Sequence, residues 1–375
     1  MDVDSKVQAL SSPRFYDHWT RRVDVIETHF AWLFLTDDFA YKLKKPVRAQ
    51  LLDQTTLAAR YRGCCEEIRL NRWLAPQVYL GVVSLTLDTG NELHLYGRDR
   101  VVDWLVKMRR LPDALMLDHS MRSGSVTLEG IESVAHLLAD FYSEQVPLAI
   151  GVAEYLACMR CNMADNRTEL LAPDLQLPQA SIETLHRAQL AAFSTVVEEL
   201  GNRAANGHII EAHGDLRPEH IYLGVPPCVI DALEFSADLR TFDPVEELAF
   251  LSVECMHAGH QWIGATIVEI YRARLHDAFS PELFGFYCSL RATTRAKIVA
   301  WHLRDPEFTA RQPWAQNALR YVDLALDYAL AVSSAGATHL IEGKPVVQTP
   351  HELREQPGYA ADLEASLQHR LEPRG

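Results

Sequence analysis

The sequence predicts an α+β fold with two lobes, in which a small antiparallel sheet carrying one helix precedes a larger, mainly helical lobe. In the first 110 residues, apolar runs alternate with polar turns, which is typical of strands and hairpins. After Pro112, apolar residues recur at helical spacing, and only residues 219–223 and 228–235 have strand-like character. We therefore expect strands to dominate the first lobe and helices the second.

The strands of the first lobe are predicted from two stretches. Residues 23–44 contain two apolar, aromatic runs around the polar triplet at 36–38, the pattern of a β-hairpin. Alternating runs return over residues 82–108, with a polar turn at 88–91. These stretches predict a five-stranded antiparallel sheet.

Helices are predicted from apolar periodicity and end signals. One helix follows the first hairpin: it opens at a Thr pair, stops at Pro76, and carries apolar residues near helical spacing at Leu57, Tyr61, Cys64, Ile68 and Trp73. The helices expected in the second lobe cover residues 128–145, 179–204, 244–280 with an interruption, and 281–333 in pieces. We place the Cys158 and Cys161 pair in a helix, with packing as its role.

These elements predict how the chain is divided. We expect a hinge near residues 106–112. The predicted parts are an N-terminal extension at 1–20, a small lobe at 21–110, a large helical lobe at 111–335 and a C-terminal tail at 336–375. The tail is rich in Gly, Pro and polar residues, so we expect it to be extended or partly disordered.

Composition and charge exclude several classes of protein. The 375 residues are 48% hydrophobic and 23% charged, which is ordinary for a globular chain. The formal net charge of −14 disfavours binding to nucleic acid or to anionic membranes. The first ten residues lack the features of a signal peptide, and no apolar stretch is long enough to span a membrane. With seven cysteines, an odd number, we expect a cytoplasmic protein with reduced thiols.

The residues that indicate a function lie in "HGDLRPEHI", 213–221. This stretch resembles the H-G-D-x-x-x-x-N loop of aminoglycoside phosphotransferases and the H-R-D-L-K-P-E-N loop of protein kinases. Further on, Asp231 after a short apolar run resembles the metal-binding Asp of that family, and "FDPVEELAFL" resembles its G-D-P-x-x-D-L-A segment. The order and spacing of these segments also agree, so the resemblance implies a protein-kinase-like fold.

The small lobe can be compared with the same family. Kinases of this fold pair a strand lysine with a helix glutamate, and the pair holds the lysine against the phosphates of ATP. In "FAYKLKKP" the strand lysine is Lys42, with Lys44 on the same face as the rival candidate. In "CCEEIRLNRWLAP" the helix glutamate is Glu67, with Glu66 as second choice.

The resemblance implies roles for several residues and a requirement for ATP and Mg²⁺. Asp215 would accept or orient the proton of the substrate hydroxyl, and Arg217 would contact the γ-phosphate. Asp231 would coordinate Mg²⁺. Glu247 falls where a later Asp of the family braces the catalytic loop, so we expect it to act as structural support.

Two departures from the family pattern bear on the site. His220 stands where the loop Asn would hold a second Mg²⁺, and it is either a metal or phosphate contact or a hydrogen-bonded replacement that keeps the loop shape. The glycine-rich loop is missing, because residues 26–35 contain no Gly. Backbone amides around Thr28 and His29 are the alternative contacts for the phosphates.

The function implied is transfer of the γ-phosphate of ATP to a hydroxyl group of a small molecule. Asp231 is followed by Ala-Leu instead of Phe-Gly, which favours the small-molecule kinases, and the segments quoted most resemble an uncharacterised bacterial branch of the family. The alternative is a weak or inactive relative that binds a nucleotide or metabolite as a regulator. Phosphorylation of proteins is disfavoured, since the segment between Asp231 and Asp243 is short. The acceptor and the oligomeric state stay open.

Overall fold

In the computed structural model, residues 2–49, 52–304 and 313–338 are described. The chain divides into two compact units. Unit 1 comprises residues 1–126 and 211–242, and unit 2 comprises residues 127–210 and 243–375. The segment with the H-G-D motif therefore belongs to the unit that also contains the sheet. The lobe boundaries expected from the sequence stay a prediction.

The centre of unit 1 is a six-stranded antiparallel sheet in the order β1-β2-β3-β8-β6-β7. Its strands are β1 Asp24–Glu27, β2 Ala31–Leu35, β3 Phe39–Lys44, β6 Tyr79–Leu87, β7 Leu93–Leu95 and β8 Arg100–Arg109. Two short strands, β4 Arg48–Ala49 and β5 Leu52–Asp53, form a separate hairpin. The expectation of five strands is wrong by one, because a turn at residues 28–30 divides the first apolar run into β1 and β2.

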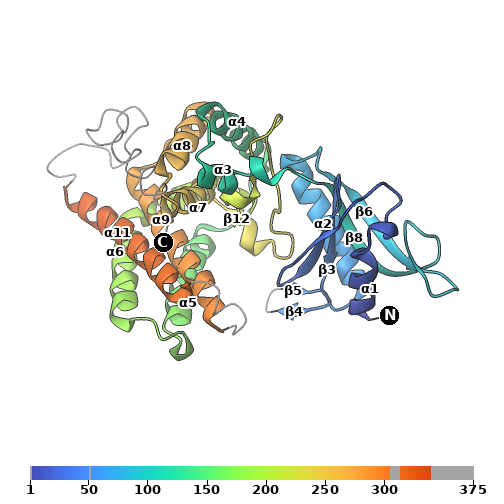
Figure 1. Ribbon diagram of the computed structural model, residues 1–375. Helices are drawn as coiled ribbons and strands as arrows, with labels where there is room; N and C mark the ends of the chain where they lie inside the picture. The colour runs from blue at the N-terminus through green and yellow to red at the C-terminus, as the bar shows by residue number, and fades with distance from the viewer. Residues whose placement is uncertain (1, 50–51, 305–312, 339–375) are drawn as a thin grey trace, which may run out of the picture. The chain divides into compact units, whose positions relative to one another are not determined.

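The single helix expected after the first hairpin is confirmed as α2, Leu57–Leu74. The hydroxyl group of Thr56 caps it by accepting a hydrogen bond from the backbone N–H of Ala59. Cys64 and Ile68 pack into a buried cluster with residues of the sheet that include Val106 and Met108. This packing holds α2 against the sheet (Figure 1).

The N-terminal residues of unit 1 pack onto the sheet. Helix α1, Val3–Leu10, is capped by the Asp2 side chain, and Leu10 joins Phe34 and Leu105 in a second buried cluster. The ammonium group of Lys6 lies 2.7 Å from the Asp103 carboxylate, and both side chains are buried. The predicted N-terminal extension therefore contains a helix that contributes to the core of unit 1.

Residues 211–242 of unit 1 form mostly loops with three very short strands, the last of which is β12, Thr241–Phe242. Strand β10, Ile221–Tyr222, pairs with β11, Cys228–Val229. The strand-like stretches expected at 219–223 and 228–235 are thus shorter than predicted. The second stops early because Asp231 has a φ of 63°, a left-handed conformation that ends a strand. A short helix, α3 Leu117–Ser123, precedes unit 2.

Unit 2 is helical, as expected. Its helices are α4 Leu128–Glu144, α5 Val152–Leu170, α6 Gln179–Ala205, α7 Pro244–His257, α8 Gln261–Leu275, α9 Pro281–Trp301 and α11 Trp314–Thr338. The interruption predicted within 244–280 is confirmed between α7 and α8, where Gly259 has a φ of 81°. Of the predicted tail, residues 339–375 lie outside the described residues.

The cysteines correct one expectation. Cys158 and Cys161 lie on α5, as predicted, but both side chains are exposed, so their expected packing is wrong. None of the seven cysteines, all within the described residues, forms a disulfide.

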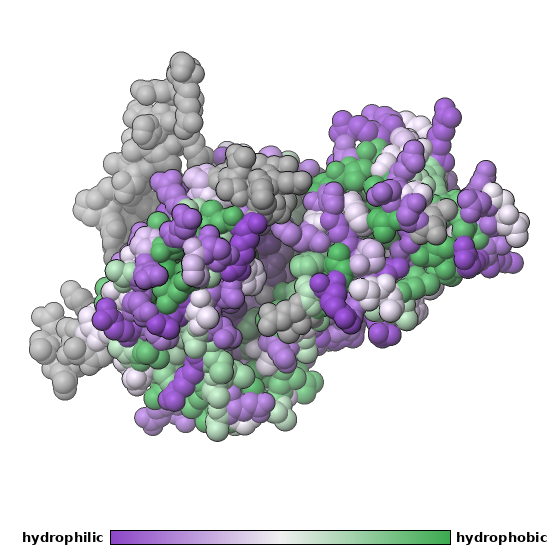
Figure 2. Space-filling model, turned by 90° about the horizontal axis from the view of Figure 1, so that it is seen from below, coloured by the Kyte–Doolittle hydropathy of each residue, from purple (hydrophilic) through white to green (hydrophobic). Residues whose placement is uncertain are grey.

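Surface properties agree with a globular chain. Each helix in the described part of the chain is too short or too polar to cross a lipid bilayer. On the face drawn in Figure 2, hydrophilic and hydrophobic residues are interspersed. Exposed apolar side chains such as Trp19 and Trp73 are a normal part of a folded surface.

Candidate active site

The H-G-D loop is held in shape by its first residue. The buried His213 side chain donates from Nε2 to the backbone oxygen of Ile230 over 2.9 Å, and its Nδ1 accepts from the backbone N–H of Asp215 over 3.2 Å. Both bonds require a neutral ring protonated at Nε2. Burial, and then the charge of His220, lower the pKa of His213 to about 4. His213 is therefore a neutral brace that joins the loop to the segment ending at Asp231.

Gly214 is required by the geometry of this loop. Its φ of 87° lies in the left-handed region, and a Cβ there would come within 2.9 Å of the Arg240 Cβ and 3.1 Å of the Leu239 carbonyl oxygen. Both the backbone conformation and the space around it exclude a side chain. The glycine of the motif thus permits the loop to pass close to the segment around Arg240.

Asp215, Arg217 and His220 lie together at the end of the loop. The Arg217 Nε lies 2.9 Å from Oδ1 of Asp215, whose side chain is 31% exposed. The Nδ1–H of His220 donates to the backbone oxygen of Asp215 over 2.8 Å. The structure therefore places a partly exposed carboxylate beside a guanidinium group, with the imidazole fixing the backbone between them.

Asp231 is held in its unusual conformation by two residues that sequence reasoning missed. Its backbone N–H donates to the Tyr79 hydroxyl over 2.9 Å, and the next N–H, that of Ala232, donates to Oδ1 of Asn71 over 2.9 Å. A non-glycine residue in the left-handed region costs about 1 kcal/mol or more, although Asp tolerates it better than most residues. Asn71 is a polar residue at a buried position of α2, and this is the signal in the sequence that could have pointed to its role.

Lys42 joins the strand, the helix and the loop. Its ammonium group lies 2.6 Å from Oδ1 of Asp231 and 3.0 Å from Oε1 of Glu67. Burial opposes the charge on Lys42, but Asp231 and then Glu67 outweigh it and raise the Lys42 pKa well above its ordinary value. Burial also opposes ionisation of Asp231, yet Lys42 and His220 hold its pKa far below the ordinary range. Lys42 and Asp231 are therefore both charged at neutral pH.

Lys44, the rival candidate, occupies a separate position on the same face of β3. Its ammonium group lies 2.6 Å from Oε2 of Glu67 and also contacts the Glu234 carboxylate. The Lys44 side chain is 1% exposed and that of Lys42 is 13% exposed. Glu67 thus binds one lysine with each oxygen, and the more accessible lysine is the one that reaches Asp231.

A second group of charges fastens α2 to residues 211–242. Arg69 pairs with Glu66 over 2.7 Å and with Glu211 over 2.9 Å. Arg240 pairs with the same two carboxylates over 2.8 and 2.9 Å. Glu66, the second choice for the lysine's partner, is therefore engaged here, which leaves Glu67 for Lys42. This ring of four charges was not predicted, because Glu211 and Arg240 are far from Glu66 and Arg69 in the sequence.

The turn between β1 and β2 occupies the place of the missing glycine-rich loop. The backbone N–H of Thr28 donates to the carbonyl oxygen of Ala31 over 2.9 Å, and the Thr28 hydroxyl donates to the same oxygen over 2.9 Å. The ring of Phe30 lies 6.0 Å from that of Phe235, in the segment after Asp231. Thr28 can offer its amide to a phosphate only if this turn opens. His29 is exposed, and its contact with a phosphate stays a prediction.

A cation could be held between Asp231 and His220. Oδ1 of Asp231 is bound by Lys42, and the other carboxylate oxygen, Oδ2, lies 3.8 Å from Nε2 of His220. In this site three carboxylates, those of Asp231, Glu67 and Glu234, are paired with only two lysines. A carboxylate and an imidazole are both metal ligands, and an excess of negative charge favours a cation. The residues present therefore fit a divalent metal ion.

Glu247 lies in unit 2. Its buried carboxylate accepts a hydrogen bond from the Tyr142 hydroxyl over 2.9 Å. On the same turn of α7, burial raises the pKa of Glu246 to about 7, against the opposing charge of Arg291. The expected bracing of the catalytic loop by Glu247 stays a prediction.

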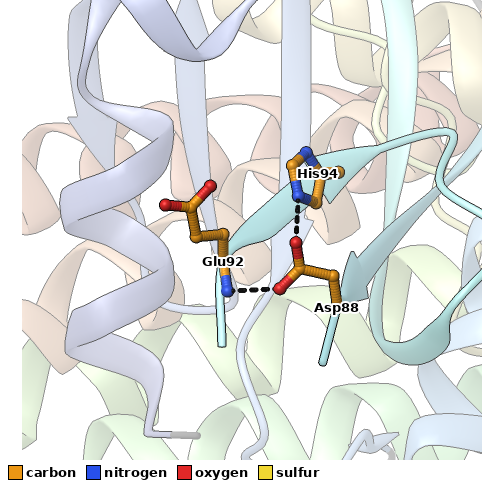
Figure 3. Close-up of side chains that lie close together, drawn as sticks. All are labelled: Asp88, Glu92 and His94. Carbon is orange, nitrogen blue, oxygen red and sulfur yellow. Dashed lines mark hydrogen bonds and ion pairs between the residues drawn. The ribbon is translucent and has the colours of Figure 1, made fainter. Parts of the chain in front are cut away.

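Within the described residues, one group of three potential metal ligands lies apart from this site, at the β6–β7 turn (Figure 3). The Asp88 carboxylate accepts the backbone N–H of Glu92 over 2.8 Å and lies 3.0 Å from Nε2 of His94. Both contacts close the turn, and Glu92 and His94 are exposed. The turn itself therefore accounts for this cluster.

A strand lysine paired with a helix glutamate and a loop aspartate, in a chain that also has a helical unit, defines a kinase-like fold. Comparison with solved structures confirms it. The chain aligns with a choline/ethanolamine kinase family protein of Mesorhizobium loti at a TM-score of 0.52 and 13% identity, covering 89% of this chain and 99% of that one. A choline kinase of Cryptosporidium parvum aligns at a TM-score of 0.52 and 10% identity, covering 90% and 98%. The predicted resemblance to small-molecule kinases is thus confirmed for the fold.

Sequence comparison adds relatives but no activity. The chain matches no family model. Uncharacterized proteins of Mycobacterium tuberculosis and Mycobacterium bovis are 28% identical to it over 311 residues, which is 82% of this chain. The chain spans 59% of the length of these relatives.

Proposed function

We propose that this protein is a kinase of small molecules, which transfers the γ-phosphoryl group of ATP to a hydroxyl group. The observation that carries the proposal is the position of Lys42, within 3.0 Å of Glu67 and 2.6 Å of Asp231. An ammonium group held by a helix carboxylate, beside a loop carboxylate, is what phosphate binding in this fold requires. The small-molecule kinases with the same fold support this reading.

Each residue of the site would have one task. Lys42 would exchange the Asp231 oxygen for phosphate oxygens while Glu67 keeps it in place. Asp215 would accept the proton of the acceptor hydroxyl as the oxygen bonds to the γ-phosphorus. The bond from that phosphorus to the bridging oxygen breaks, and ADP leaves with the electron pair. Arg217, 2.9 Å from Asp215, would neutralise charge on the phosphoryl oxygens.

A divalent cation would be held by Asp231 with His220. When bound, it would neutralise the phosphate charge that these side chains alone leave in excess. The acceptor is proposed to be a small molecule, since only eleven residues separate Asp231 from Asp243 and three of these form a short helical turn at Asp238–Arg240. So short a segment leaves little backbone with which to bind a peptide substrate.

The test compares the wild type with Asp215→Asn, which keeps the size of the side chain and removes its basicity. ATP turnover is measured with a panel of amino alcohols, sugars and aminoglycosides, and nucleotide binding is measured separately. We expect turnover with at least one acceptor, a loss of about 100-fold or more in the variant, and unchanged nucleotide binding. Nucleotide binding without turnover on any acceptor would instead favour the role of a regulator.

A further inference from the structure

We propose that the divalent cation of this site is a first-row transition-metal ion, selected over Mg²⁺ by the imidazole of His220. The inference rests on the proposed function, because it concerns the ion that accompanies ATP. It depends on which ring nitrogen of His220 is already bonded and on what the other one faces.

The orientation of the His220 ring is determined by its hydrogen bond. Nδ1 lies 2.8 Å from the backbone oxygen of Asp215, and a carbonyl oxygen can only accept, so Nδ1 carries the proton. The side chain is 11% exposed, so it has little freedom to turn. In the neutral ring, Nε2 is then the nitrogen whose lone pair is available for a ligand.

That nitrogen faces the Asp231 carboxylate. Nε2 lies 3.8 Å from Oδ2 of Asp231, while Oδ1 of Asp231 is bound by Lys42. One ion bonded to each atom at about 2.0 to 2.2 Å can span this separation. Arg217 is the competitor, since its Nη2 lies 3.5 Å from the same nitrogen, at the outer limit of a hydrogen bond.

A His in place of the family's Asn can keep the hydrogen bond that shapes the loop, but it changes the atom that is offered to the metal ion from oxygen to nitrogen. An Asn side chain could donate its amide N–H to the Asp215 carbonyl oxygen and offer its own oxygen to the ion. His220 makes the same bond with Nδ1 but offers a nitrogen. Mg²⁺ prefers oxygen ligands, whereas the affinity of imidazole for divalent ions rises from Mn²⁺ to Cu²⁺ and falls again at Zn²⁺. The site therefore loses an oxygen ligand that suits Mg²⁺ and gains a nitrogen ligand that suits a transition metal.

The test uses the full chain with Mn²⁺ and a non-hydrolysable ATP analogue. Electron spin-echo spectroscopy detects an imidazole nitrogen bound to Mn²⁺, and growth with ¹⁵N-histidine changes that signal without altering the protein. We expect nitrogen coupling in the wild type and its loss in His220→Asn. The ratio of Mn²⁺ affinity to Mg²⁺ affinity should also fall by about tenfold or more in the variant.

The second cluster provides the matched control. If Asp88 and His94 bound Mn²⁺ adventitiously, His94→Asn would reduce the nitrogen signal; we expect this variant to leave both the signal and the affinity ratio unchanged. If the analogue binds with Mn²⁺ but the wild type has no nitrogen coupling, the inference about His220 is overturned and the proposed function stands. If the analogue fails to bind with either Mn²⁺ or Mg²⁺, the proposed function fails and the inference fails with it.

Discussion

The ammonium group of Lys42 lies 2.6 Å from Oδ1 of Asp231, although 189 positions separate the two residues in the sequence. Lys42 is also held by Glu67, so it would keep one partner if a phosphate displaced Asp231. This pairing is the basis of the first two predictions, which separate the roles of the two lysines.

Lys42→Met should strongly reduce nucleotide turnover with little loss of stability. Glu67 would still be paired with Lys44, and the Asp231 side chain is 44% exposed, so water can solvate it. Loss of one charge that neutralises the phosphates should lower kcat/KM by about 100-fold or more. Steady-state kinetics and urea unfolding check both parts. A variant that turns over ATP normally would contradict the role assigned to Lys42.

Lys44→Met should instead destabilise the fold by about 3 to 5 kcal/mol, because it leaves a buried carboxylate without its partner. Lys44 is 1% exposed and Glu234 is 11% exposed. The double variant with Glu234→Gln removes that carboxylate charge and should regain part of the lost stability. Urea unfolding of the single and double variants measures this. Equal stability of the two would mean that the Lys44 and Glu234 charges are not coupled.

Gly214→Ala should destabilise the protein more than Gly124→Ala. Both glycines have left-handed backbones, with φ of 87° and 69°, but a Cβ at Gly124 meets nothing within 4 Å. For the control, Gly124→Ala, the free energy of unfolding should therefore fall only by the cost of a left-handed backbone at Ala, about 1 to 2 kcal/mol. At Gly214 the contact with Arg240 should add roughly 1 to 3 kcal/mol. Equal losses in thermal unfolding would show that the loop has room for a side chain.

Acid should weaken the protein through His213. Its pKa falls from an ordinary value of 6.5 in the unfolded chain to about 4 in the fold, so between these values the unfolded chain binds the extra proton. Stability is therefore full above pH 6.5 and declines towards pH 4, by roughly 3 kcal/mol at most.

The comparison that isolates this histidine is His213→Asn, with His136→Asn at an exposed position as the control. Urea unfolding at about pH 7 and about pH 5 should give a smaller loss of stability for the first variant than for the wild type and the control. Parallel losses in all three proteins would exclude His213 as the source.

Much of unit 1 could be predicted from the sequence because its signals are local. The α2 helix has apolar residues at helical spacing, a Thr cap and a terminal Pro, and α2 was predicted nearly to its ends. The turn at 28–30 was missed, because Thr28 closes it with its own hydroxyl and no Gly, Pro or Asn marks it. Helix α1 was missed because eight residues show too little periodicity.

The candidate site was predictable only in part, because many of its contacts join residues that are far apart in the sequence. Lys42, Glu67 and Asp231 were identified from motif order, and the structure brings them together, while their roles stay a prediction. The supporting contacts could not be inferred. Tyr79 lies 152 positions from Asp231, and Lys44 lies 190 positions from Glu234, so nothing local in the sequence links them.

The measurement that tests the central claim most directly is calorimetric and thermal titration of the wild type and Asp231→Asn with ATP and either Mg²⁺ or Mn²⁺. Asn tolerates the left-handed backbone of Asp231, so the variant should fold. At about a hundred times its dissociation constant, the nucleotide should add about 2.7 kcal/mol to the stability of the wild type, and the metal-dependent part should vanish in the variant. A wild type that gains no stability with either metal would contradict the claim that Lys42, Glu67 and Asp231 form a nucleotide site.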